Sequence, residues 1–498
     1  PTERNSDANN SFPHAEARVL KVAFVHHHLE PGGVTRVMET AAGAIASHGD
    51  ELQGVALSGR PYRGAGLSEV SVVEGIDYAE SCPLVQPVEL AERLRKTAAD
   101  ALGTDPDVWH VHNHSLGKNA AFTEAIHLLA ESGHGMLLHL HDFAEDGRPA
   151  NYLALRSGLD HPRRAYPLSP KIHYAALNQR DAGFLREAGL PGEQLHLMPN
   201  PIGSPTQANA SSESADDLPD NLALCPVRAV RRKNLGELAL LAAAHPELTL
   251  ANTLGPTNPS YAPAFERWKA FAQELGLPVR YAFAEDCNRS FDDLVAASRF
   301  LITTSVAEGF GLAFLEPWAQ GKTLTGRNLP EITADFEQAG LELSHLYQRL
   351  DLPRRLIDSD DLESRVRSAL ENLFNAYGEA LPKNGVARAL DAISREDRID
   401  FGRLDEELQE QLVRKVASSP ELAKEVRLQA NLEPAPSATL ATNAKVVDRA
   451  YGMAAYGKKL VEAYRQIAEA ESGPVENLDA GALLKSFLKA ERLFLLRS

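Results

Sequence analysis

Short apolar runs alternate with amphipathic stretches through the first half of the chain. The apolar runs lie at residues 18–25, 107–113, 136–142, 171–177 and 194–198. Stretches with helical periodicity follow at residues 34–48, 119–131 and 179–190, and Gly49 is the expected C-cap of the first of them. Continuous apolar runs of this length are typical of strands buried on both faces. This half therefore predicts an α/β domain with a doubly wound parallel sheet, whose ligands bind at the carboxyl ends of the strands.

The same alternation returns after residues 204–221, a stretch rich in Ser, Ala, Asn and Asp that we interpret as a linker. Its apolar runs lie at residues 222–230, 248–254, 279–284 and 300–304. From residue 341 to about 430 the chain is charged and helical in pattern, with helices expected at 362–377 and 400–416, and we interpret it as a helical insertion. Residues 445–471 predict one long helix and residues 480–496 a last one.

Composition restricts the classes of protein. The chain has 498 residues, 44% of them hydrophobic and 24% charged, which is a globular composition with room for two or three domains. A net charge of −17 argues against a general nucleic-acid or anionic-membrane binder. Cys82, Cys225 and Cys287 are scattered, which indicates a reducing compartment and no structural zinc. We find no apolar run of transmembrane length and no signal peptide, and residues 1–16 are polar and expected to be flexible. We therefore expect a cytoplasmic protein without a transmembrane segment.

The stretch at 305–316 combines an apolar strand, two glycines and a segment that predicts a helix. Glycines at such a turn let backbone N–H groups approach a ligand at the positive end of the helix. Glu308 lies on the loop, and Glu316 is expected about a turn and a half into the helix, so both carboxylates can face one cleft. A capped strand–helix unit with surface glutamates explains the bare pattern equally well.

Basic and histidine side chains also fall at strand ends. Arg228 and Lys233 bracket the turn after residues 222–230, where two cations can hold a diphosphate, although a solvated basic loop is the simpler alternative. Three histidines that follow strands are candidates for function, and each alone is more often structural: His112, His114 and His141. Metal binding by residues 26–28, three consecutive histidines, is disfavoured, because neighbours on a strand point to opposite faces.

These motifs, taken in order, resemble retaining glycosyltransferases of family 4. The resemblance covers roughly residues 18–335 and the helix near 445–470, and the insertion at 341–430 lies outside it. It rests on Gly32-Gly33, His141-Asp142, Asn200-Pro201-Ile202, Arg228 with Lys233, and the E-x7-E motif of Glu308 and Glu316. The chain departs from the family pattern at Pro226-Val227, at Pro317 and before Pro330-Glu331.

The resemblance implies a GT-B fold, in which two Rossmann-like doubly wound parallel-sheet domains face a cleft. Residues 18–203 would form the acceptor-side domain, completed by residues 474–498, and residues 222–473 the nucleotide-sugar donor domain. The catalytic residues it implies are Glu308, His141, Arg228 and Lys233. The donor-binding residues are Gly33, Arg228, Lys233, Glu308, Gly309, Phe310, Gly311, Leu312 and Glu316. On the acceptor side it implies Gly32, His112 and His114.

The implied reaction moves a sugar from a nucleotide-diphosphate sugar to a hydroxyl of a small-molecule or saccharide acceptor, with net retention. The resemblance implies neither a metal nor a resident cofactor, because cationic side chains and helix ends stabilise the leaving diphosphate. Three alternatives stay open: a nucleotide-sugar epimerase, a sugar phosphorylase, and a non-catalytic sugar-nucleotide-binding module. The presence of both glutamates and both cations speaks against the last of these.

Overall fold

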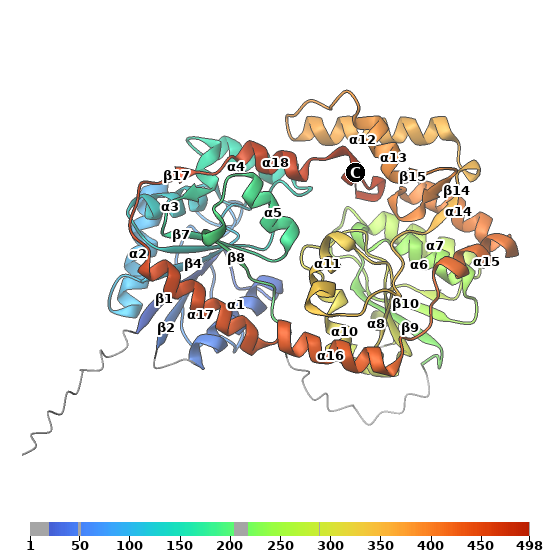
Figure 1. The fold of residues 1–498 in the computed structure, drawn as a ribbon, viewed down its shortest axis with the longest axis horizontal. Helices are drawn as coiled ribbons and strands as arrows, with labels where there is room; N and C mark the ends of the chain where they lie inside the picture. Colours follow the sequence, from blue (N-terminus) through green and yellow to red (C-terminus); the bar gives the residue numbers. More distant parts are fainter. Residues whose placement is uncertain (1–18, 48–50, 204–217, 288, 498) are drawn as a thin grey trace, which may run out of the picture.

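The computed structural model describes residues 19–47, 51–203, 218–287 and 289–497. The predictions for residues 1–16, for the Gly49 cap and for most of the linker at 204–221 fall outside these ranges. Within them the chain forms two α/β domains that lie side by side, with helix α16 (Ser437–Tyr451) below the right-hand domain in Figure 1. The predicted GT-B architecture is confirmed.

The N-terminal domain is built on a seven-stranded parallel sheet of order β3-β2-β1-β4-β5-β7-β8. Its strands are β1 (Leu20–His26), β2 (Leu52–Ser58), β3 (Val70–Val72), β4 (Val108–His112), β5 (Met136–Leu140), β7 (Ile172–Ala176) and β8 (Leu195–Leu197). The helices are α1 (Gly33–Ala46), α2 (Pro87–Leu102), α3 (Ala120–Glu131), α4 (Pro149–Gly158) and α5 (Gln179–Glu187). Alternate residues of β1 enter two separate cores, because Val22 and Phe24 pack on the α1 face and Ala23 and Val25 on the α2–α3 face.

The C-terminal domain contains a five-stranded parallel sheet of order β11-β10-β9-β12-β13. Its strands are β9 (Leu222–Arg228), β10 (Thr249–Leu254), β11 (Val279–Arg280), β12 (Phe300–Thr303) and β13 (Leu324–Gly326). The helices beside it are α6 (Leu235–Ala244), α7 (Ala262–Glu274), α8 (Phe283–Cys287), α9 (Phe291–Ala297), α10 (Glu316–Ala319) and α11 (Pro330–Ala339). The strand predicted at 279–284 is shorter, because Ala282 has a positive φ of 58° and α8 follows at once.

The insertion at 341–430 is more than helical. Besides α12 (Ser359–Ala376), α13 (Gly385–Ile393), α14 (Glu406–Ala417) and α15 (Pro420–Gln429), it contains an antiparallel sheet of β14 (Asp351–Pro353), β16 (Arg398–Asp400) and β15 (Ser394–Arg395). The helix predicted at 400–416 begins only at Glu406, because the Asp405 carboxylate caps it by accepting from Leu408 N. Leu408 and Leu412 share one core with α6, so the insertion is part of the donor-side domain.

The helix predicted at 445–471 is broken at Gly452, which adopts an extended conformation between α16 and α17 (Met453–Glu469). A Cβ at Gly452 would lie 2.3 Å from the carbonyl oxygen of Asp448, so this close approach requires glycine. Helix α16 packs on α10 of the C-terminal domain, whereas α17 packs on α1 and the N-terminal sheet. The chain therefore returns to the N-terminal domain near residue 453, about twenty residues before the boundary predicted at 473.

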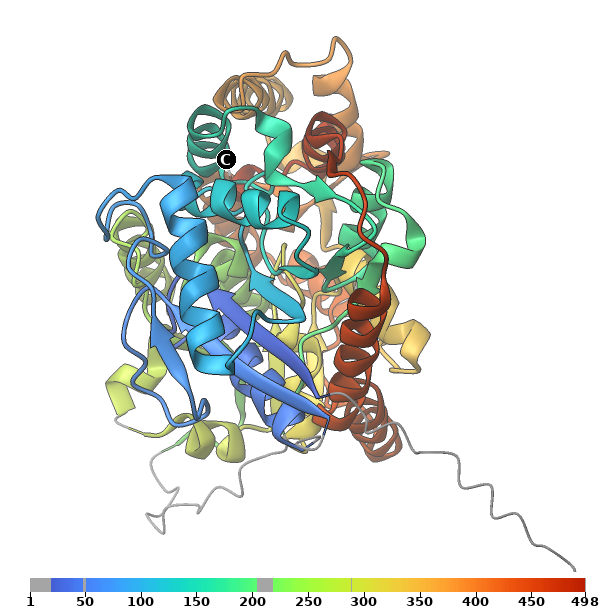
Figure 2. The same ribbon diagram turned by 90° about the vertical axis from the view of Figure 1, so that its left-hand side faces the viewer.

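The C-terminal segment crosses between the domains a second time. After the two-residue strand β17 (Glu476–Asn477), helix α18 (Ala480–Phe487) packs against α5, and the red segment runs along the N-terminal domain in Figure 2. The helix predicted to reach residue 496 ends at Phe487, and residues 490–497 form two 3-10 turns, which we call the C-terminal tail. Its Ala490, Leu493 and Leu495 enter the core of the C-terminal domain. None of the described helices is long and apolar enough to cross a membrane.

Candidate active site

The Glu308 loop leaves the sheet at the carboxyl end of β12. Gly311 has a φ of 97°, and a Cβ there would lie 2.8 Å from Ile332 Cγ2, so the loop needs glycine at this position. A 3-10 turn follows at Leu312–Phe314, and α10 begins at Glu316. The prediction that Glu316 lies a turn and a half inside a helix is therefore wrong. Pro317 fits here because proline has no backbone N–H, and the N–H groups in the first turn of a helix have no partner within the helix.

Lys233 and Glu308, predicted from separate motifs, form an ion pair. Lys233 ends the 3-10 turn Arg231–Lys233 after β9, and its side chain is 12% exposed against 9% for Glu308. Thr304 Oγ1 donates to Lys233 O at 2.7 Å, and Val306 N donates to Arg232 O at 2.9 Å. These bonds fasten the basic turn to the Glu308 loop, so the ammonium group and the carboxylate are held together without a ligand.

Arg228 lies at the end of β9 and is exposed. Its Nη1 donates to Gly255 O at 3.3 Å, and it lines neither of the two cavities described below. The shared grip of Arg228 and Lys233 on a diphosphate stays a prediction.

The first of these cavities, of about 1040 Å³, lies between the two domains around Glu316. Gly32, Gly33 and Leu312 line it, and Arg36 Nη1 reaches across from α1 to within 3.5 Å of Glu316 Oε1. Burial raises the pKa of Glu316, an effect that Arg36 and Lys233 oppose. The backbone of Gly32 is extended and a Cβ at Gly33 would meet open space, so neither conformation by itself demands glycine.

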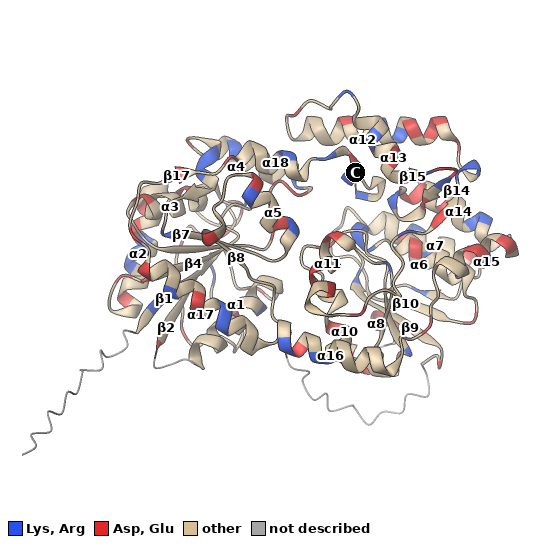
Figure 3. Cartoon of the chain, in the orientation of Figure 1, with Lys and Arg blue, Asp and Glu red and all other residues tan. Residues whose placement is uncertain are grey.

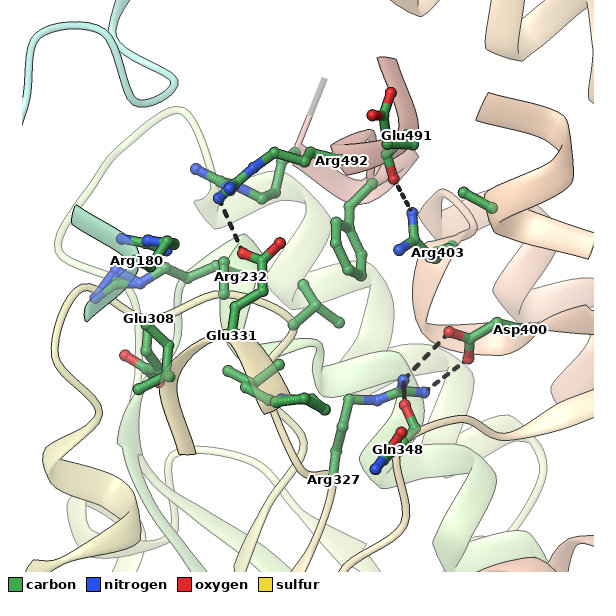
Figure 4. Close-up of a pocket in the computed structure, with 18 of the residues that line it drawn as sticks. Arg180, Arg232, Glu308, Arg327, Glu331, Gln348, Asp400, Arg403, Glu491 and Arg492 are labelled. Carbon is green, nitrogen blue, oxygen red and sulfur yellow. Dashed lines mark hydrogen bonds and ion pairs between the residues drawn. The ribbon is translucent and has the colours of Figure 1, made fainter. Parts of the chain in front are cut away.

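A second cavity, of about 630 Å³, lies on the other side of the Glu308 loop. Residues of the β5–α4 connection, including Asp142, Asp146 and Arg148, form its N-terminal wall, and Glu308 and Gly309 line it from the donor side. Arg492 and Arg497 of the C-terminal tail also line it, and Figure 4 shows Arg492 beside the cavity. This cavity thus joins both domains and the tail.

His141 touches the Glu308 loop through its backbone. A Cβ at Gly309 would lie 3.8 Å from His141 O, and Asn178 Nδ2 of the N-terminal domain donates to Gly309 O at 2.8 Å. The His141 ring turns into the sheet, where its Nε2 shares a hydrogen bond of 2.8 Å with His112 Nδ1. Burial and neighbouring histidines hold the pKa of His141 well below its usual value, so the ring is neutral near pH 7.

The other predicted histidines are also buried. His112 and His114 are 0% and 1% exposed, and they line neither cavity. Alternation on β4 turns His110 and His112 toward α17, where His110 Nδ1 shares a hydrogen bond of 2.7 Å with Tyr464 OH, and His114 Nε2 binds Ala165 O at 2.8 Å. The predicted acceptor-side role of His112 and His114 stays a prediction.

Three buried histidines form a group that could hold a metal ion. The ligand atoms of His110, His112 and His139 lie within 4.8 Å of one another. Both nitrogens of His110 already take part in hydrogen bonds, one of them to His139 Nδ1 at 3.1 Å. A zinc ion takes the lone pair of each ligating nitrogen, so its binding to either nitrogen of His110 would break one of these hydrogen bonds. The hydrogen-bonded stack fits these residues better, and the prediction of a metal-free enzyme stays a prediction.

Sequence reasoning missed the role of Arg327. It is 2% exposed, its Nη2 donates to Glu237 Oε2 at 2.6 Å and to Asp400 Oδ1 at 3.0 Å, and Tyr347 OH donates to Glu237 Oε1 at 2.8 Å. The guanidinium is thus a neutralised structural group that fixes the floor of the second cavity. No local sequence pattern predicts these ion pairs, because Glu237 and Asp400 are 90 and 73 residues away from Arg327.

The comparisons with known proteins agree with the fold. No protein-family model matches the chain. It is 26% identical over 416 residues, 77% of this chain and 79% of the relative, to mannosylglucosyl-3-phosphoglycerate synthase from Petrotoga mobilis. A glycosyltransferase from Rickettsia africae superposes with a TM-score of 0.50 at 13% identity, over 91% of this chain and 99% of that one. HepE from Anabaena, solved with UDP-glucose, gives a TM-score of 0.49 at 13% identity, over 89% and 98%. The match to the Rickettsia structure, together with the two parallel sheets, shows that the chain has the GT-B fold of glycosyltransferases.

Proposed function

We propose that this protein is a retaining glycosyltransferase that moves a sugar from a nucleotide-diphosphate sugar to an acceptor hydroxyl without a metal ion. The observation that carries the proposal is the Lys233–Glu308 ion pair, which joins a basic turn to a glycine loop at the cleft between two Rossmann-like domains. The order of the motifs supports family 4 within the GT-B enzymes.

The donor would bind at the ends of β9 and β12. Lys233 would exchange its bond to Glu308 for one to the diphosphate, which carries more negative charge, and Arg228 would add a second cation. Glu308, released by that exchange, would accept hydrogen bonds from hydroxyls of the donor sugar. Glu316, beside the cavity that Gly33 and Leu312 line, would accept from the ribose.

Retention by double displacement needs a carboxylate nucleophile next to the anomeric carbon, and inversion needs a base for the acceptor on the opposite face. Once Lys233 holds the diphosphate, Glu308 would be engaged by hydroxyls of the donor sugar, and the His141 ring is buried against His112, so neither is disposed for these roles. These contacts support attack from the same face, in which an oxygen of the departing diphosphate takes the acceptor's proton. The new bond then keeps the configuration of the donor.

The acceptor proposed here carries an acidic group. The Petrotoga relative is named for a product that contains 3-phosphoglycerate. In this chain, the second cavity beside Glu308 is rich in arginine, which suits an acid of that kind. We therefore propose a phosphorylated acid, or a sugar attached to one, as the acceptor.

The test begins with thermal shifts for nucleotide diphosphates, because a ligand at 100 times its Kd adds about 2.7 kcal/mol of stability. The nucleotide found would then be supplied as its α-linked sugars with a phosphorylated acid. NMR of the fresh product should show an α-linkage, and a β-linkage would refute retention. A changed sugar from the donor alone would indicate an epimerase, dependence on free phosphate a phosphorylase, and no turnover of any donor a binding module.

A further inference from the structure

Nine arginines line the cavity beside the Glu308 loop, although the chain as a whole carries a net charge of −17. They come from both domains, the insertion and the tail: Arg148, Arg180, Arg232, Arg327, Arg349, Arg395, Arg403, Arg492 and Arg497. Figure 3 shows basic positions on α5 and around the C-terminus. Such a concentration of cations from separate segments indicates a site for an anion.

The charges of this cavity do not balance. Six of the nine guanidinium groups have a carboxylate partner, as Arg148 has in Asp142 at 2.5 Å and Arg497 in Asp146 at 3.4 Å. Among the described residues, no carboxylate partner is found for Arg232, Arg395 or Arg403. Of the acidic residues in the lining, Asp391 alone lacks a basic partner within the described chain, so positive charge is in excess.

Three arginines from three separate segments gather at the end of the cavity next to Glu308 (Figure 4). Arg180 belongs to α5 of the N-terminal domain and is held by Asp181 at 2.8 Å. Arg232 belongs to the turn after β9, where Val306 N donates to its carbonyl oxygen, and its guanidinium has no ion-pair partner in the part of the chain that the structure describes. Arg492 comes from the tail, where its Nη2 lies 3.0 Å from Glu331 Oε2. Burial lowers the pKa of Arg492, an effect that the charge of Glu331 opposes and that of Arg180 reinforces.

The tail is held firmly enough to present Arg492. Ala490 and Leu493 lie in the core of the C-terminal domain, and Arg403 Nη1 donates to Glu491 O at 2.9 Å and to Leu493 O at 3.0 Å. At its far end, Arg497 contacts Asp146 of the other domain. The tail therefore spans the two domains and forms one wall of the cavity.

We propose that Arg180, Arg232 and Arg492 bind a phosphate monoester on the acceptor, and that the C-terminal tail is thereby part of the acceptor site. The proposal rests on the proposed function for the reaction, and it adds the group that is recognised and the residues that recognise it. A phosphate monoester offers three oxygens and nearly two negative charges, which suits three guanidinium groups that approach from different segments. A single carboxylate has two oxygens, and one guanidinium is enough to bind it.

The experiment measures the binding of 3-phosphoglycerate, inorganic phosphate and glycerate to the full chain by calorimetry, with and without a saturating nucleotide diphosphate. The variants are Arg492→Ala and Arg232→Ala, the second of which removes an exposed side chain that has no ion-pair partner within the described ranges. Arg231→Ala is the matched control, because Arg231 lies in the same turn and faces Glu406 at 3.9 Å. Arg388→Ala controls for the tail, because Arg388 pairs with Glu491 and does not line the cavity.

We expect 3-phosphoglycerate to bind the wild type and both controls with the same affinity. Its affinity for each of the two variants should be about 10- to 150-fold lower, because each substitution removes one charge-assisted hydrogen bond. The affinity for the nucleotide diphosphate should be unchanged. Wild-type affinity in both variants would overturn the proposal. Glycerate that binds as tightly as 3-phosphoglycerate would assign the site to a carboxylate instead.

Two further outcomes separate this proposal from the proposed function. If the nucleotide diphosphate displaces 3-phosphoglycerate and is weakened equally by both substitutions, the arginines serve the donor, and the acceptor subsite is refuted. If 3-phosphoglycerate binds as expected but no nucleotide diphosphate binds the wild type, the phosphate site stands and the proposed reaction fails. Should Arg492→Ala not fold, Arg492→Gln keeps the bulk of the side chain, and Arg232→Ala still decides the question.

Discussion

Replacing Glu308 by glutamine should lower turnover and, at the same time, tighten the binding of the nucleotide diphosphate. Glu308 holds the Lys233 ammonium group, and both side chains are largely buried, at 9% and 12% exposed. A diphosphate that binds Lys233 has to displace this carboxylate. Glutamine keeps the shape of the side chain but removes the competing charge, so the cost of that displacement falls.

The sizes of the changes in affinity follow from the contact between Lys233 and Glu308. A charge-assisted hydrogen bond is worth about 1.5–3 kcal/mol, so Lys233→Ala should weaken the diphosphate about 10- to 150-fold. An exposed ion pair is worth up to about 1 kcal/mol and this pair is largely buried, so Glu308→Gln should tighten the diphosphate about fivefold or more. The kcat should fall more than KM rises, because the contact of Glu308 with the sugar strengthens as positive charge develops on the ring.

Calorimetry with the nucleotide diphosphate and steady-state kinetics with the nucleotide sugar measure the two effects separately. The double variant Glu308→Gln/Lys233→Ala should bind the diphosphate as Lys233→Ala does, because without the ammonium group there is nothing for Glu308 to block. Glu363→Gln, at an exposed ion pair with Arg367, is the control. The reasoning is refuted if Glu308→Gln weakens the diphosphate tenfold, or if its kcat equals that of the wild type.

Three other expectations concern stability and metal. Arg327→Leu leaves the buried carboxylates of Glu237 and Asp400 without their cation, so the free energy of unfolding in urea should fall by about 3–5 kcal/mol. The exposed control Arg367→Leu should change it by no more than about 0.5 kcal/mol. Equal losses in the two variants would contradict the stabilising role of the buried network. Burial raises the pKa of Glu145 from 4.5 to about 7, so its contribution to stability is complete below pH 4.5 and falls by about 3 kcal/mol as the pH rises to 7. Glu145→Gln should abolish that fall in urea titrations between pH 4.5 and 8, and a fall as steep as the wild type's would show that another group causes it. Turnover should persist in EDTA, and a complete loss that Mn²⁺ restores would disprove the metal-free reaction.

The sequence by itself determined the two parallel sheets and the position of the glycine loop. Strands buried on both faces must be apolar throughout, so β1, β4, β5, β9 and β12 were visible as continuous runs close to their observed bounds. Strand β2 (LQGVALS) was missed, because its run is interrupted by a glutamine and a glycine. The family resemblance assigned both Lys233 and Glu308 to donor binding, but the sequence did not predict their ion pair.

Tertiary structure alone decided which charges meet. Arg327 and Glu237 are 90 residues apart, and Arg36 and Glu316 are 280 apart, so no local period relates them. The same holds for the tail, whose Arg492 reaches the cavity only because the chain crosses between the domains at Gly452 and again after Phe487. The periodicity of hydrophobic positions predicts which face of a helix or strand is buried, because side chains on one face recur with the geometry of that element. It does not predict which side chains of other elements contact that face, because those contacts depend on how elements distant in sequence pack together.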